Sequence, residues 1–136
     1  MKTTEYLFLY GTLKPDGADR EIADIVSQLR SVGRGYVAGK LYDLGDYPGV
    51  VIDHSSTSSV KGLLVEMPSD EAVLSALDKY EEFDPSNPRD SLFVRTKTRV
   101  RLTDGRSVKG WIYVYNRNPG SAPLIRGGHY SKSKVA

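Results

Sequence analysis

A β-hairpin near the end of the sequence constrains the fold more than any other feature. Asp104-Gly105 is a residue pair typical of a tight turn, and a strand-like segment lies on each side of it, at 92–102 and 107–116. The first segment alternates apolar or hydroxyl side chains with the cations Arg95, Lys97, Arg99 and Arg101. Alternation with a period of two places the cations on one face of a strand. The sequence therefore predicts two antiparallel strands joined at this turn.

The cationic row Arg95–Arg101 has two interpretations. It could track a phosphate backbone, or it could be a solvated face that discourages edge-to-edge pairing of strands. The net charge is only +2, and no aromatic residue is interleaved on that face. We therefore favour the solvated face and predict no nucleic-acid partner. A nucleic-acid-binding module using this row is the less favoured alternative.

The rest of the chain mixes short strands with two predicted helices. The predicted strands span 6–10, 35–44, 50–52 and 60–67, and the predicted helices span about 18–30 and 69–82. The helices show the i, i+3, i+4 apolar spacing of one buried face, and Ser69 is the predicted N-cap of the second. The segment 84–91 is predicted to be irregular. Because several connections between strands are too short for a parallel crossover, we expect an α+β fold, with a largely antiparallel curled sheet or barrel and two helices packed on it.

Length and composition indicate one domain. The 136 residues fit a single unit spanning 1–136, whose Pro/Gly-rich tail from about 117 we expect to be loosely ordered. The sequence has no cysteine, which excludes disulfides, thiolate nucleophiles and cysteine-ligated metals. The early apolar run Tyr6–Tyr10 is too short for a signal sequence or a membrane span. We expect a soluble cytoplasmic protein without a membrane partner.

The sequence contains no convincing motif for a cofactor or metal site. Gly33-x-Gly35-x-x-x-Gly39 resembles a dinucleotide loop, but it follows a predicted helix and leads into a strand, so no helix N-terminus would meet the phosphate. Walker A, G-x-S-x-G and H-E-x-x-H patterns do not occur. His54 and His129 lie in predicted loops and are interpreted as surface residues. We predict no cofactor and no metal.

Two segments could carry chemistry. The corner Tyr10-Gly11-Thr12-Leu13 ends a buried strand, and its backbone N–H groups could converge on a carboxylate. From this segment alone, a simple turn is the favoured interpretation. Glu81 lies four residues after Leu77, on the buried face of the second helix and near the negative end of its dipole. Both influences would raise the pKa of Glu81 and suit a general base; the alternative is a solvated glutamate at a frayed helix end.

Several segments in order carry a resemblance to a known family. "LYGTL", "GKLYDLGDYPGV", "LDKYEEF", "FVR", "WIYVY" and "IRGGHY" together resemble the γ-glutamylcyclotransferase-like family from residue 7 to residue 130. The resemblance implies a small mixed barrel with flanking helices. It also implies that Glu81, in the pattern L-D-x-Y-E-G, is the acid/base. The loop Tyr10–Leu13 would hold the α-carboxylate of the substrate, and Tyr115 or backbone amides would stabilise an oxyanion.

The activity implied by the resemblance is release of 5-oxoproline from a small γ-glutamyl compound, by general acid/base catalysis without a cofactor. The substrate amine attacks its own γ-carbonyl and expels the attached amine or amino acid. A non-catalytic binder or regulator of γ-glutamyl metabolites on the same fold is the alternative. Replacing Glu81 would separate the two, because a pure binder has no turnover to lose.

The sequence departs from the family pattern at three positions. Glu82 stands where glycine usually follows the key glutamate, Phe93 replaces a common tyrosine, and His129 lies where aspartate is common. Glu81 matches the pattern, whereas Glu82 would point about 100° away around the helix. These changes bear on substrate preference and leave room for a member that has lost activity.

Overall fold

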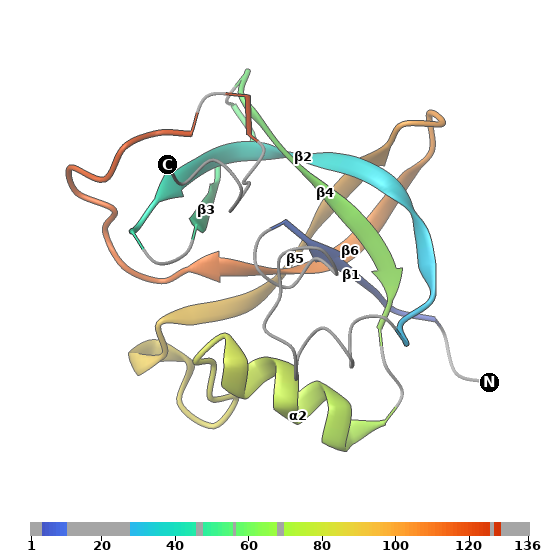
Figure 1. Cartoon of the computed structure of the whole chain (residues 1–136), viewed down its shortest axis with the longest axis horizontal. Helices are drawn as coiled ribbons and strands as arrows, with labels where there is room; N and C mark the ends of the chain where they lie inside the picture. Colours follow the sequence, from blue (N-terminus) through green and yellow to red (C-terminus); the bar gives the residue numbers. More distant parts are fainter. Residues whose placement is uncertain are drawn as a thin grey trace.

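The computed structural model describes residues 4–10, 28–45, 48–55, 57–67, 70–125 and 127–128 (Figure 1). The strands are β1 (Tyr6–Leu9), β2 (Ser31–Asp43), β3 (Pro48–Ile52), β4 (Ser59–Glu66), β5 (Phe93–Leu102) and β6 (Ser107–Tyr115). The described residues also contain one α-helix, α2 (Glu71–Tyr80), and one short 3₁₀ helix, η1 (Pro88–Asp90).

The strands close into a mixed barrel. They are hydrogen-bonded in the order β3-β2-β4-β1-β6-β5, and an additional pairing between β2 and β5 closes the wall. Only β1 and β6 run parallel among these pairs. The second half of the long strand β2 pairs with β3, from Gly39↔Ile52 to Asp43↔Pro48. The predicted small, mainly antiparallel barrel is confirmed.

The predicted hairpin is confirmed, and the structure adds its register. β5 and β6 pair antiparallel from Phe93↔Tyr115 to Arg101↔Ser107. Gly105, in the connecting turn, has φ of 97°, a left-handed conformation that glycine adopts without a steric penalty. The Asp-Gly pair thus sets the turn, and the turn sets which side chains of the two strands face each other.

The helices differ from the prediction. The first predicted helix lies outside the described residues except for 28–30, which form a turn, and β2 begins at Ser31. Of the two predicted flanking helices, the described residues contain α2. The N-cap of α2 is Asp70 and not the predicted Ser69, because the Asp70 carboxylate accepts a hydrogen bond from the Ala72 N–H at 2.9 Å. η1 adds one ordered turn to a segment predicted to be irregular.

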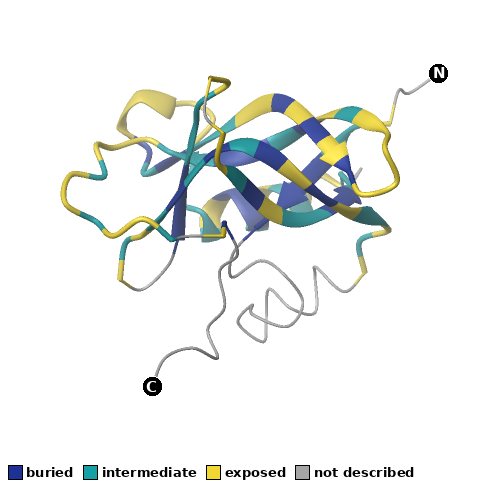
Figure 2. Ribbon diagram, turned by 90° about the horizontal axis from the view of Figure 1, so that it is seen from above, coloured by how far each residue is buried: buried dark blue, intermediate teal, exposed yellow. Residues whose placement is uncertain are grey.

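Two hydrophobic cores stabilise the fold. One fills the barrel and includes Phe8, Val37, Leu64, Val100 and Ile112. The other lies between the barrel wall and α2, where buried side chains from four strands meet the helix: Leu7, Leu9, Val65, Leu77, Phe93 and Tyr113. Figure 2 shows buried and exposed residues alternating along the strands. The second core fixes α2 against the barrel and so positions the end of the helix.

The tail makes backbone contacts with the barrel. The Asp43 N–H donates to the Pro123 carbonyl, the Ile125 N–H donates to the Leu41 carbonyl, and the Lys61 N–H donates to the Gly128 carbonyl. The sequence predicts a loosely ordered tail from about 117, whereas the described residues 123–125 and 128 are tied to β2 and β4.

Nowhere in the described ranges does a helix reach the length and apolarity required to cross a membrane.

Candidate functional site

The end of α2 is closed by a specific backbone arrangement. The Phe83 N–H donates to the Asp78 carbonyl at 2.8 Å, and the Glu82 N–H donates to the Lys79 carbonyl at 3.1 Å. These two bonds form the Schellman motif that commonly ends helices. Glu82 occupies its left-handed position, with φ of 54°. The motif fixes the direction in which Glu81, the C-cap residue, leaves the helix.

Glu81 has a strongly perturbed carboxyl group. Its pKa is raised from 4.5 to about 8, first by burial and second by the negative charge of Glu82. A carboxyl with a pKa near 8 can accept a proton and return it at neutral pH. The pKa of Tyr10 is also raised, by burial and then by the charge of Glu81. The two side chains are therefore close enough to interact electrostatically.

Tyr10 lies buried just after β1. It is 6% exposed, and its hydroxyl donates to the backbone carbonyl of Tyr113 at 2.6 Å. The hydroxyl thus joins the end of β1 to β6. The other residues of the predicted carboxylate-binding corner, Gly11, Thr12 and Leu13, lie outside the described residues, and the corner stays a prediction.

Tyr115 lies at the same end of the barrel as the end of α2. It is the cross-strand partner of Phe93, and the two rings are 5.5 Å apart between centroids. Leu92, just before β5, donates its N–H to the Glu82 carbonyl at 3.1 Å. This bond ties the start of β5 to the residue after Glu81. Tyr115 and Glu81 are therefore brought to one region of the molecule.

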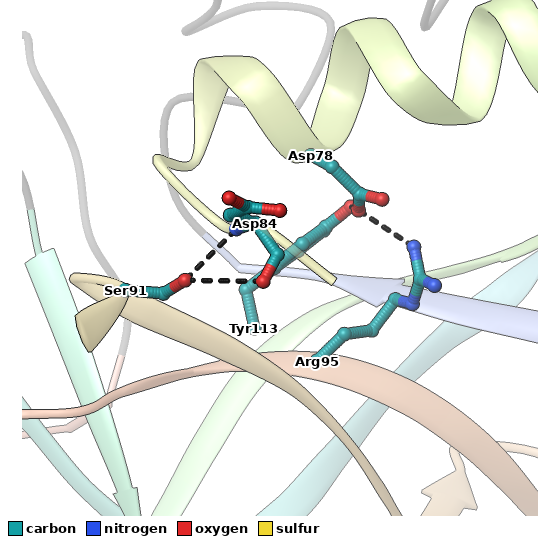
Figure 3. A network of polar contacts seen from close by, with 5 residues as sticks. All are labelled: Asp78, Asp84, Ser91, Arg95 and Tyr113. Carbon is teal, nitrogen blue, oxygen red and sulfur yellow. Dashed lines mark hydrogen bonds and ion pairs between the residues drawn. The ribbon is translucent and has the colours of Figure 1, made fainter. Parts of the chain in front are cut away.

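A buried polar network braces this region (Figure 3). One carboxylate oxygen of Asp78 accepts hydrogen bonds from Arg95 Nη1 and from the Tyr113 hydroxyl, each at 2.6 Å. Asp78 is only 5% exposed. Burial, followed by the bond to Asp78, raises the pKa of Tyr113, which keeps its hydroxyl protonated as a donor. The network joins α2 to β5 and β6, one helical turn before Glu81.

The position of Arg95 corrects the solvated-face interpretation of the cationic row. Its side chain is only 17% exposed and pairs with Asp78. The guanidinium also lies over the rings of Phe83 and Trp111, at 5.4 and 5.8 Å from their centroids. Arg95 lies on the same face of β5 as the other cations of the row, but α2 covers the end of that face where Arg95 lies. Arg95 is therefore a structural cation beside the candidate site.

The loop after α2 is ordered by a buried serine, also visible in Figure 3. Ser91, 6% exposed, accepts a hydrogen bond from the Asp84 N–H at 2.8 Å, as Figure 3 shows. Its hydroxyl also donates to the Asn87 carbonyl at 3.0 Å. These bonds close the loop 84–91 on itself. Because this loop connects α2 to β5, they help to fix the end of the helix against the strand.

The described residues include one of the two histidines. His54 is exposed in the turn after β3, as predicted, and His129 lies outside the described residues. In the part of the chain that the structure describes, no three His, Cys, Asp or Glu side chains gather to hold a metal ion.

Replacing Glu82 with glycine is expected to stabilise the protein. A left-handed conformation costs a residue other than glycine about 1–2 kcal/mol, partly offset by the greater freedom of glycine in the unfolded chain. We expect a net gain of about 1 kcal/mol and a melting temperature a few degrees higher. Glu82→Gln is the matched control, because it removes the charge and keeps the strained backbone. Equal melting temperatures for the two variants would contradict the backbone argument.

Comparisons with known proteins show the family and the fold. The family model described as "Gamma-glutamyl cyclotransferase, AIG2-like" matches residues 7–132. An AIG2-like protein from Mus musculus is similar in structure, with 22% identity, a TM-score of 0.72, and 96% of this chain and 90% of that chain covered. YkqA from Bacillus subtilis has 20% identity and a TM-score of 0.68, with 94% of this chain covered; the match spans 40% of YkqA.

A solved gamma-glutamyl cyclotransferase has 14% identity and a TM-score of 0.63, with 91% of this chain and 73% of that chain covered. At these identities the likeness to solved structures shows the fold. No match was found among curated proteins.

Proposed function

The chain belongs to the gamma-glutamyl cyclotransferase, AIG2-like family, and we propose that it releases 5-oxoproline and a free amine or amino acid from a small γ-glutamyl compound. The observation that carries the proposal is the Glu81 carboxyl at the end of α2, with its pKa raised to about 8. The α-ammonium of such a substrate cannot attack a carbonyl until a base takes its proton. A carboxyl with a pKa near 8 is a stronger base than an ordinary carboxylate, and at neutral pH it can also return the proton.

The proposed reaction has three proton transfers, and two of them pass through Glu81. Glu81 takes a proton from the α-ammonium of the substrate, and the freed amine attacks the γ-carbonyl carbon to close a five-membered ring. The tetrahedral intermediate then collapses, the bond from the γ-carbon to the leaving nitrogen breaks, and protonated Glu81 donates its proton to that nitrogen. The ring nitrogen loses its second proton to solvent as the lactam forms. The products are 5-oxoproline, the amine and one proton, and Glu81 is again a carboxylate. One amide replaces another, so the step needs no redox partner.

The other candidate residues would orient the substrate. The backbone N–H groups of Gly11, Thr12 and Leu13 would hold the α-carboxylate, with Tyr10 shaping the base of this corner. Holding the flexible glutamyl chain curled brings amine and carbonyl together, which is a proximity effect. Tyr115 or a backbone amide would donate to the developing oxyanion.

The test is release of 5-oxoproline by purified protein from γ-glutamyl amines, γ-glutamyl dipeptides and glutathione. We expect the protein to turn over at least one of these substrate classes, and we expect Glu81→Gln to lose that turnover. Glu71→Gln, which changes an exposed carboxylate at the other end of the same helix, is the matched control and should retain turnover. Binding of a γ-glutamyl compound without release of 5-oxoproline would contradict the proposal and favour the non-catalytic binder.

A further inference from the structure

A groove of about 670 Å³ lies on the barrel wall, and none of its lining residues belongs to the candidate site. It forms because β2 and β5 pair only at Gly35↔Leu102 and Tyr36↔Arg101. Past these pairs β2 continues against β3, and β5 continues against β6. The groove opens between the diverging strands. Its volume is within the range of about 300–1,000 Å³ typical of small-molecule sites.

The groove concentrates positive charge. Four basic side chains line it, and none of its lining residues is acidic: Lys97, Arg99, Arg101 and Lys109 are the cations. Lys97 is neutralised by Glu5, at 3.2 Å between Nζ and the carboxylate. Among the described residues, the other three have no carboxylate within ion-pair distance. Because the net charge of the chain is only +2, this concentration is local.

The strand register places two of these cations directly opposite each other. Arg99 and Lys109 are direct cross-strand partners, and like charges directly opposite each other are destabilising. Protection of a sheet edge does not account for this pair, because β6 pairs with β5 on one side and β1 on the other, so Lys109 is not on an edge strand. A bound anion would relieve the repulsion.

An aromatic ring completes the groove. Tyr36 is a large side chain, 39% exposed, and it is the cross-strand partner of Arg101. The two side chains therefore project from the same face of the sheet, about 5 Å apart at their Cβ atoms. The ring belongs to β2, whereas the cations belong to β5 and β6. The sequence of β5 alone therefore could not show an aromatic residue beside the cationic row. A flat ring beside a row of cations suits a ligand with an aromatic base and phosphates.

We propose that this groove binds a nucleoside di- or triphosphate, in addition to the proposed cyclotransferase activity elsewhere on the chain. Arg99, Arg101 and Lys109 hold the phosphates, and Tyr36 stacks against the base. A long nucleic acid is disfavoured because the chain as a whole is nearly neutral. The groove suits a compact polyanion.

Calorimetric titration with ATP, inorganic triphosphate and adenosine tests the proposal. We expect ATP to bind more tightly than either of its parts. Arg99→Ser should weaken ATP binding by about tenfold or more, because it removes charge-assisted hydrogen bonds to phosphate. Tyr36→Ser should weaken ATP binding but leave triphosphate binding unchanged. Melting curves check that each variant is folded.

The matched control is Arg34→Ser, which removes an exposed cation of β2 outside the groove. It should bind ATP as the unmodified protein does, and release of 5-oxoproline should be unchanged in all three variants. Binding of ATP weaker than about 1 mM, or an equal loss in Arg34→Ser, would overturn the proposal. A single-stranded oligonucleotide that binds where ATP does not would also overturn it.

Discussion

Glu81→Gln is expected to lower kcat for release of 5-oxoproline by about a hundredfold to ten-thousandfold, the range that general acid/base catalysis contributes. Glutamine has the size of the protonated glutamate and stays uncharged. Because the pKa of Glu81 is about 8, the carboxyl is mostly protonated at neutral pH, so the variant should fold normally. It cannot take the proton from the α-ammonium, and it cannot return one to the leaving amine. Steady-state kinetics on the substrate found in the panel measure the loss.

The pH profile separates the base role from a general loss of structure. As a base, Glu81 must be ionised, so kcat/KM should rise with pH through a limb near 8. The charge of Glu82 is the second cause of the raised pKa of Glu81. Glu82→Gln should therefore lower that pKa and move the limb to lower pH. The α-ammonium of the substrate titrates identically with the unmodified protein and with Glu82→Gln. A displacement between their two pH profiles therefore reports the pKa of Glu81. Coincident profiles would contradict the role of Glu81 as base.

The barrel was partly predictable because some of its features are determined by short segments of the sequence. Alternation along 92–102 and the Asp104-Gly105 turn predict the hairpin, and short connections predict antiparallel neighbours. Closure was not predictable, because the parallel contact of Leu7 with Trp111 and the contact of Tyr36 with Arg101 join residues far apart in sequence. Ser69 and Asp70 are adjacent and both are good N-caps, so the sequence alone could not decide between them.

In the candidate site, too, local sequence patterns were predictable and tertiary contacts were not. Glu81 was proposed from its helical position and its apolar neighbours. Burial is the first cause of its raised pKa, and the charge of Glu82, which was not anticipated from the sequence, is the second. The Asp78 network was missed because its members lie on three elements and none carries a local signal. Alternation placed Arg95 correctly on the cationic face of β5. It could not reveal that α2 covers one end of that face, because only tertiary packing decides that.

Asp78→Ala is expected to destabilise the protein by about 3–5 kcal/mol, because removing one partner of a buried ion pair leaves the other charge uncompensated. The Arg95 guanidinium would lose its carboxylate, and its Nε is already buried without a hydrogen-bond partner. The Tyr113 hydroxyl would lose its acceptor as well. Urea denaturation followed by circular dichroism measures the free energy of unfolding. Asp78→Asn should cost less, since an amide oxygen can still accept both bonds.

Arg30→Ala is the matched control for an ion pair at the surface. Arg30 is 83% exposed and lies 3.7 Å from the Glu66 carboxylate, so its loss should change stability by no more than about 0.5 kcal/mol. The double variant Asp78→Ala with Arg95→Ala should be more stable than the sum of the single losses predicts, because no charge is then left unpaired. Strict additivity would contradict a direct pair. It would mean that Asp78 stabilises α2 mainly through Tyr113.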